Sequence, residues 1–174
     1  MKVLVAYYSD TGNTEKIAKA IFEEASKKDK VDLKKIKDVT VDNLNDYDFV
    51  FLGSPCIAGD IATPVKKLLT AIPKSPKFKL AAFLTHMSPV SEQHDGYGRC
   101  LVSFENAKKE KQVDFKGSFD CQGGPAPRVQ ELVKQGRNVP ADLFEKLMAE
   151  ARKHPSPEDQ KGAKEFARQV LQKI

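Results

Sequence analysis

The chain has 174 residues, 40% of them hydrophobic, with 29 lysine and arginine residues against 24 acidic ones and a formal net charge of +5. This length suits one hydrophobic core, so we expect a single domain over residues 1–174. Because charges of both signs are interspersed, we expect a mildly basic surface and no nucleic-acid-binding arm. The three widely spaced cysteines suggest neither a disulfide framework nor a zinc site, so we expect no metal and a reducing compartment.

The apolar run at the start of the sequence is too short for the hydrophobic region of a signal peptide. Elsewhere, no segment approaches the roughly 18 apolar residues of a membrane-spanning helix. We therefore expect a cytoplasmic protein that does not associate with a membrane.

Strand and helix patterns alternate in the first half of the chain. Residues 2–8 form an apolar run that predicts a buried strand, and residues 14–27 repeat apolar side chains at the spacing of a helix with one buried face. Residues 31–36 predict a more polar strand near an edge of the sheet, and residues 48–54 predict a second buried strand. Residues 63–72 predict a helix whose first threonine is the N-cap and whose proline takes the first helical position.

The second half of the chain continues the alternation. Residues 79–86 predict a third buried strand, residues 98–110 a helix, and residues 115–122 another polar strand near an edge. A Gly- and Pro-rich stretch then leads to an additional short helix over residues 140–154. The last helix, over residues 156–174, begins with a serine suited to the N-cap, followed by a proline and two carboxylates that favour a helix start.

This alternation predicts a three-layer α/β sandwich, in which helices cover both faces of a parallel sheet. Ligands of such sheets bind beyond the carboxyl ends of the strands, where the strand order reverses. The segments that directly follow the strands are therefore the candidates for a functional site.

The segment SDTGNT, residues 9–14, follows the first strand and opens the first helix. The start of a helix offers unpaired N–H groups, and the hydroxyls of Ser9, Thr11 and Thr14 add donors around the same place. The lysine of a P-loop and the G-x-G-x-x-G pattern are both absent, which favours a terminal monophosphate over a nucleoside triphosphate with magnesium. Turns and caps also use these residue types, but the hydroxyls outnumber what one cap requires.

Two further loops are expected at the same edge of the sheet. The segment GSPCIAGDIATP, residues 53–64, has small residues and two glycines, which allow the backbone to approach a flat ligand closely. The long segment THMSPVSEQHDGYGRC, residues 85–100, follows the next buried strand. Together with residues 9–14, these loops suit a phosphate at one end and an apolar ring at the other.

Other chemistries of this architecture lack their residues. A phosphoacceptor domain needs carboxylates clustered after the first strand and an aspartate closing the third, where Gly53 and Ser54 stand. The C-x5-R pattern of cysteine phosphatases and the G-x-S-x-G pattern of α/β-hydrolases are absent. We therefore expect no catalytic residues of these types.

The stretch VAYYSDTGNTEKIA resembles the phosphate-loop signature of the flavodoxin family, and GSPCIAGDIATPVKKLL resembles that family's second flavin loop. The likeness continues through FLTH, KGSFDCQG and HPSPEDQKGAKEFARQV, so it covers most of the chain. The resemblance implies a five-stranded parallel sheet of order 2-1-3-4-5, with the extra short helix as an insertion, and noncovalently bound FMN. The cofactor-binding residues that it implies are Ser9, Asp10, Thr11, Gly12, Asn13 and Thr14 at the phosphate, and Ser54, Pro55, Cys56, Ile57, Ala58, Gly59, Thr85, His86, Met87 and Tyr97 at the ring.

Flavodoxins move electrons between other redox proteins, so the resemblance implies an electron carrier with redox partner proteins, present as a monomer or a weak homodimer. The backbone of Ala58 and Gly59 is the candidate acceptor for the N5–H of reduced flavin. Tyr97 either stacks on the ring or packs at a helix start, and His86 either contacts the flavin or is an ordinary strand-end histidine. Cys56 is interpreted as a small buried residue in preference to a redox thiol.

Two other functions stay open. The first is an FMN-dependent NAD(P)H oxidoreductase that acts on quinones or free flavins, which the same fold supports. The second is a family member that has lost FMN and serves as an interaction domain. Unlike classic flavodoxins, which are acidic, the chain is basic and has no tryptophan, so neither its partners nor its potential follow from the resemblance.

Overall fold

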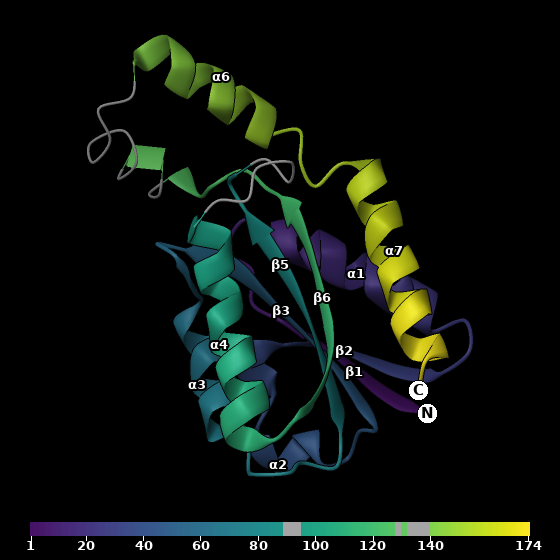
Figure 1. Cartoon of the computed structure of the whole chain (residues 1–174). Helices are drawn as coiled ribbons and strands as arrows, with labels where there is room; N and C mark the ends of the chain where they lie inside the picture. The colour runs from purple at the N-terminus through teal and green to yellow at the C-terminus, as the bar shows by residue number, and fades with distance from the viewer. Residues whose placement is uncertain (89–94, 128–129, 132–139) are drawn as a thin grey trace.

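The computed structural model describes residues 1–88, 95–127, 130–131 and 140–174. In this part of the chain, parallel strands form one sheet in the order β2-β1-β3-β5-β6 (Figure 1). Their bounds are β1 Lys2–Tyr7, β2 Lys30–Lys35, β3 Phe49–Ile57, β5 Lys79–His86 and β6 Asp114–Gln122. A two-residue strand, β4 (Asp60–Ile61), pairs antiparallel with the end of β3. When the five parallel strands are numbered in chain order without β4, their order in the sheet is 2-1-3-4-5. This confirms the expected topology.

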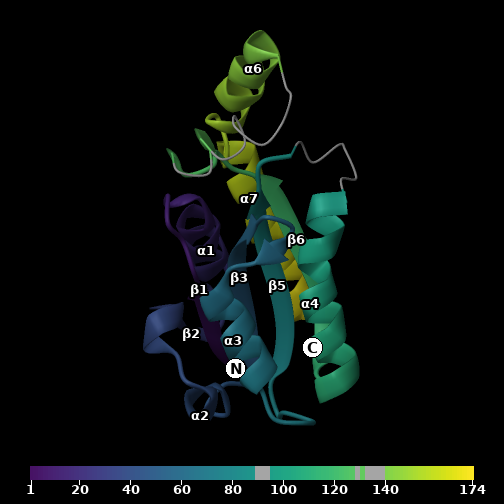
Figure 2. The same ribbon diagram turned by 90° about the vertical axis from the view of Figure 1, so that its left-hand side faces the viewer.

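Helices cover both faces of this sheet, as the three-layer prediction requires (Figure 2). On one face, α1 (Asn13–Ala25) packs beside α7 (Pro157–Gln172); on the other, α3 (Thr63–Ala71) packs beside α4 (Asp95–Lys111). The remaining described helices are the short η1 Ile36–Asp38 and α2 Val41–Leu44, and α6 Ala141–Ala151 beyond the carboxyl edge of the sheet. The expected helix over residues 140–154 is therefore present as α6.

The central strands supply side chains to two separate cores. In β1, Val3, Val5 and Tyr7 pack under α1 and α7, whereas Leu4 and Ala6 pack on the face covered by α3 and α4. Alternate side chains of a strand point to opposite faces, so a strand covered on both sides needs apolar residues at every position. This is the physical reason why the continuous apolar runs predicted the central strands correctly.

The edge strands and helix starts also follow local signals, with one correction. The polar strands β2 and β6 lie at the two edges, as expected. Ser156 caps α7 in a capping box with Asp159, which confirms the predicted start. The predicted start of α3 was wrong by one residue: Ala62 is the N-cap, because its carbonyl accepts the first helical hydrogen bonds, and Thr63 lies inside the helix. No helix in the described residues is long and apolar enough to cross a membrane.

Candidate functional site

The start of α1 lies at the carboxyl edge of the sheet, directly after β1 (Figure 1). Gly12 is its N-cap and has a φ of 87°, a left-handed conformation that glycine adopts at little cost. A glycine has no side chain that could accept from the first N–H groups of the helix, as a serine or aspartate cap would. A Cβ placed on Gly12 would meet no atom within 4 Å. No side chain caps the first N–H groups of α1, so they remain donors that an anion could use.

The loop that leads to this helix start is shaped by its own side chains. The Ser9 hydroxyl accepts a hydrogen bond from the Gly12 N–H at 3.1 Å. The Tyr8 hydroxyl donates to the Asp10 carboxylate at 2.7 Å, and this hydrogen bond raises the pKa of Tyr8. Asp10 and Thr11 are exposed. The loop thus leaves the Thr11 hydroxyl accessible, while Tyr8 holds the carboxylate of Asp10.

Two buried threonines join the start of α1 to the end of β5. The Thr14 and Thr85 hydroxyl oxygens are 2.8 Å apart, and both side chains are buried. A hydroxyl has one hydrogen to donate. Because one of the two hydroxyls donates to the other, only one of them keeps its hydrogen for a further acceptor. Thr14, predicted at the phosphate, and Thr85, predicted at the ring, therefore form one hydrogen-bonded pair, which their separation in the sequence did not indicate.

Asn13 ties the phosphate-loop segment to the backbone that follows β6. Its side-chain amide donates to the Gly124 carbonyl at 2.7 Å. The next glycine back along the chain is also held, because the Gly123 N–H donates to the His86 carbonyl at 2.8 Å. The sequence interpretation assigned Asn13 to the cofactor and missed Gly123 and Gly124. The pair of consecutive glycines was the one sequence signal for this contact, since a close approach of two backbone segments often requires glycine.

Replacing Gly123 by alanine should lower stability by about 1 kcal/mol, because a Cβ would lie 3.0 Å from the Asn13 amide nitrogen and crowd this contact. The matched control is Gly124→Ala, whose Cβ would find its nearest neighbour at an ordinary 3.5 Å. Urea unfolding of both variants measures the difference. Equal losses for the two variants would contradict the assigned contact.

The segment after β3 differs from the predicted loop. Strand β3 continues through Ile57, and the chain reverses at Ala58 and Gly59 to form β4. Both turn residues have positive φ, 52° and 83°, as in the tight turns that match the twist of antiparallel strands. Ala58 holds this conformation at a cost that Gly59 does not have. The Ile57 side chain is 39% exposed beside the turn.

The side chain of Ser54 has a structural role in the same hairpin. It is buried, accepts from the Ala62 N–H at 2.8 Å, and donates to the carbonyl of Pro55 at 2.9 Å. The hydrogen bond from the Ala62 N–H joins the two sides of the hairpin at its base. Of the predicted residues here, Ile57, Ala58 and Gly59 lie at the tip, while Ser54 is turned to the interior.

Asp60 connects this hairpin to both helices of its face. Burial by itself raises the pKa of Asp60, but hydrogen bonds from Lys66, the Ile61 N–H and Ser103 outweigh burial, so the pKa lies below its usual value. Lys66 of α3 forms an ion pair with the carboxylate. The Ser103 hydroxyl of α4 donates to it at 2.9 Å. Asp60 is therefore an anion at neutral pH and anchors the hairpin between α3 and α4.

A histidine and a carboxylate pair at the ends of β5 and β6. His86 Nε2 lies 3.0 Å from Asp120 Oδ2, and His86 is 7% exposed. The parallel register sets Leu84 beside Asp120, which brings the aspartate within reach of a histidine two residues further on. Sequence reasoning missed Asp120, because nothing local signals a partner on the adjacent strand. Whether His86 also contacts a flavin stays a prediction.

The remaining predicted residues lie in the third loop. Met87 is half-buried, and its carbonyl accepts from the Gln122 side chain at 2.8 Å. Tyr97 belongs to the first turn of α4, but its side chain lies outside the described residues, as do residues 89–94 of the loop. Stacking of Tyr97 on a ring therefore stays a prediction.

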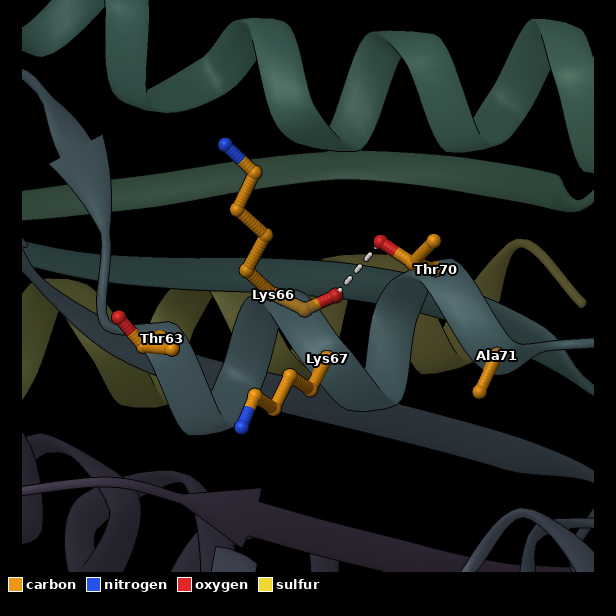
Figure 3. A pocket seen from close by; sticks show the side chains of 5 residues that line it. All are labelled: Thr63, Lys66, Lys67, Thr70 and Ala71. Atoms are coloured by element: carbon orange, nitrogen blue, oxygen red, sulfur yellow. Dashed lines mark hydrogen bonds between the residues drawn. The ribbon is translucent and has the colours of Figure 1, made fainter.

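A separate pocket of about 310 Å³ lies on the surface of α3 (Figure 3). Its lining residues are Thr63, Lys66, Lys67, Thr70 and Ala71. All belong to one helix, and the Thr70 hydroxyl donates back to the Lys66 carbonyl at 2.8 Å. The lining includes none of the predicted cofactor-binding residues, so this pocket is distinct from the candidate site.

The strand order and these loops define a doubly wound α/β protein whose candidate ligand site lies at the carboxyl edge, where the order reverses between β1 and β3. A family model described as a flavodoxin domain matches residues 4–168. The chain belongs to the flavodoxin family.

Two relatives agree with this membership, and a solved structure shares the fold. The flavodoxin-like domain-containing protein BilS of Clostridioides difficile is 31% identical, over 98% of this chain and 97% of that protein. An uncharacterized protein of Methanocaldococcus jannaschii is 30% identical, over 98% of this chain and 99% of its own length. Oxidised Flavodoxin 1 from Bacillus cereus has the same fold, with a TM-score of 0.67 at 15% identity, covering 100% of this chain and 99% of that one.

Proposed function

We propose that the chain binds FMN and carries electrons between redox partner proteins. The observation that supports this most strongly is the start of α1. There, a glycine N-cap leaves the first helix N–H groups without a side-chain cap, next to a loop rich in hydroxyls. Fixed N–H dipoles and hydroxyls can hold a phosphate without a lysine. This is the donor set that the phosphate of FMN requires.

In this proposal, the residues divide by the part of the cofactor that they hold. Ser9, Thr11 and the pair of Thr14 and Thr85 would surround the phosphate together with the helix N–H groups. The hairpin tip from Ile57 to Gly59 and the end of β5 would border the ring. Bound FMN supplies one- and two-electron transfer, and the protein orients it and tunes its potential.

The chain's own residues prepare this edge of the sheet. The positive φ values of Ala58 and Gly59 fix which peptide groups the hairpin tip presents. The tie from Asn13 to Gly124 holds the phosphate loop at a constant distance from the segment after β6. The half-exposed Ile57 adds an apolar surface that excludes water from one side. These contacts are all made within the protein, so they hold the loops in place and lower the ordering cost of binding.

The test begins with the protein as purified. We expect a yellow protein with the visible spectrum of a flavin, from which heat or acid releases a compound with the mass of FMN. Anaerobic titration with a chemical reductant should then bleach the flavin, whereas NADH and NADPH should act slowly. A colourless protein that takes up no added FMN would contradict the cofactor assignment. Fast reduction by either pyridine nucleotide would contradict the carrier assignment and indicate an oxidoreductase.

A further inference from the structure

Two cysteines meet where α4 packs on the β3–β4 hairpin. Cys56 lies near the end of β3, and Cys100 lies near the start of α4. Cys56 packs against the core cluster that contains Cys100, and the Cys100 thiol is close enough to raise the pKa of Cys56. Cys100 is fully buried in the core under α3 and α4, and Cys56 is partly buried against the same core. The two thiols, distant in sequence, thus lie close together in one core of the fold.

Contacts on both sides of the cysteines hold α4 in this position. One turn further along the helix, the Ser103 hydroxyl donates to Asp60 at 2.9 Å. On the other side, the Arg99 guanidinium covers Gly59 so closely that a Cβ there would lie 3.3 Å from it. Residues three and four positions apart share a helix face. One face of α4 therefore docks on the hairpin, with Cys100 between these two contacts.

The third cysteine lies in a different core. Cys121 is buried on the face of the sheet that α1 and α7 cover, whereas Cys56 and Cys100 belong to the opposite face. The sheet separates Cys121 from the pair, so it cannot bond to either thiol while the protein is folded. It is a built-in control for any chemistry of the pair.

We propose that Cys56 and Cys100 form a reversible disulfide, a redox-modification site whose oxidant is a small-molecule disulfide. One cysteine sulfur attacks the reagent and releases its first thiol, giving a mixed disulfide. The other cysteine sulfur then displaces the second reagent thiol and closes the Cys56–Cys100 bond. The protein loses two hydrogens as it is oxidised, and the reagent gains both as it is reduced.

Such a bond would join the hairpin covalently to the first turns of α4. Both segments border the proposed ring site, so the bond would lock the hairpin tip in one position. The inference does not rest on FMN, because the protein's own packing brings the two cysteines together in one core. The same bond is therefore expected with or without cofactor.

The reaction is expected to be slow at neutral pH. The hydrogen bond with Cys100, burial, and the nearby carboxylates of Asp120 and Asp60 all raise the pKa of Cys56. Disulfide exchange requires a thiolate. Equilibrium is therefore the proper measurement, approached at alkaline pH from both the reduced and the oxidised side.

The experiment incubates folded protein in buffers with varied ratios of oxidised to reduced dithiothreitol. Remaining thiols are alkylated, and intact mass and peptide mapping follow. Oxidation should protect two of the three thiols, with a single link between the peptides of Cys56 and Cys100 that excess reductant reverses. Cys121→Ala should keep this link, and both Cys56→Ser and Cys100→Ser should lose it.

Three outcomes would overturn the proposal. In the first, all three thiols are still free to be alkylated after incubation in the most oxidising buffer. In the second, the disulfide involves Cys121 or joins two chains. In the third, the disulfide forms only after urea unfolds the protein. If a serine variant fails to fold, the peptide maps of wild type and of Cys121→Ala still show whether Cys56 and Cys100 form the disulfide. An oxidised protein with a higher urea midpoint would show that the bond forms within the native structure.

Discussion

Replacing Thr11 and Thr14 together by valine should weaken FMN binding by roughly 100-fold or more and leave riboflavin binding far less affected. A hydrogen bond to a charged group contributes about 1.5–3 kcal/mol, so two lost donors account for at least this factor. Only FMN carries the phosphate, so the ratio of the two dissociation constants isolates it. Fluorescence titration of apoprotein with each flavin measures both constants.

The pairing of Thr14 with Thr85 calls for a second comparison. Removing the Thr14 hydroxyl also removes a buried hydrogen bond, which lowers stability whether or not FMN binds. Thr11 is exposed, so Thr11→Val tests the phosphate without this side effect. Thr70→Val, on α3, is the matched control for the same chemical change away from the site. Equal losses of FMN and riboflavin affinity would contradict the assignment of these hydroxyls to the phosphate.

Gly53→Ala should destabilise the protein by about 2–3 kcal/mol, because the centre of the sheet has no room for one more carbon. The parallel register sets Gly53 beside Phe83, and a Cβ on the glycine would lie 2.1 Å from the phenylalanine ring. Phe83 is completely buried, so its ring cannot move away into solvent. Urea unfolding, with the midpoint and slope compared to wild type, gives the loss.

A double-mutant cycle identifies the ring as the cause. In a Phe83→Ala background, the added methyl group should cost much less, since the space of the ring is vacated. Gly98→Ala is the matched control: its Cβ would meet nothing within 4 Å, and alanine favours the helix there. An equal loss from Gly53→Ala with and without the ring would contradict the close approach. Destabilisation by Gly98→Ala would show that the glycine effects are not set by local space.

Local patterns predicted the elements because each pattern has a local physical cause. The apolar runs of the central strands follow from burial on both faces, and the capping box of Ser156 and Asp159 satisfies N–H groups within one turn. The same logic applies to residues 9–14, since the order of hydroxyls and glycine around a helix start is a local pattern, and we propose that it binds the phosphate. Residues in such short-range arrangements identify themselves in a single sequence.

The failures share a different cause. The sequence predicts a loop at Ala58 and Gly59, because the pairing partner in the hairpin, β4, has only two residues and no periodic pattern. It predicts Thr63 as a cap, because threonine is a good cap in general, whereas in the structure the carbonyl of Ala62 accepts the first helical hydrogen bonds. In both places, backbone hydrogen bonds made in the folded protein outweighed the local conformational preference of the residues.

By itself, the sequence determined the layers of the fold, the positions of the strands and helices, and the loop suited to a phosphate. Tertiary structure alone decided which side chains meet: Thr14 with Thr85, His86 with Asp120, and Cys56 with Cys100. These pairs depend on strand order, register and the docking of α4, which bring together residues far apart along the chain. A local pattern records whether a residue is buried, but only the folded chain settles what it is buried against.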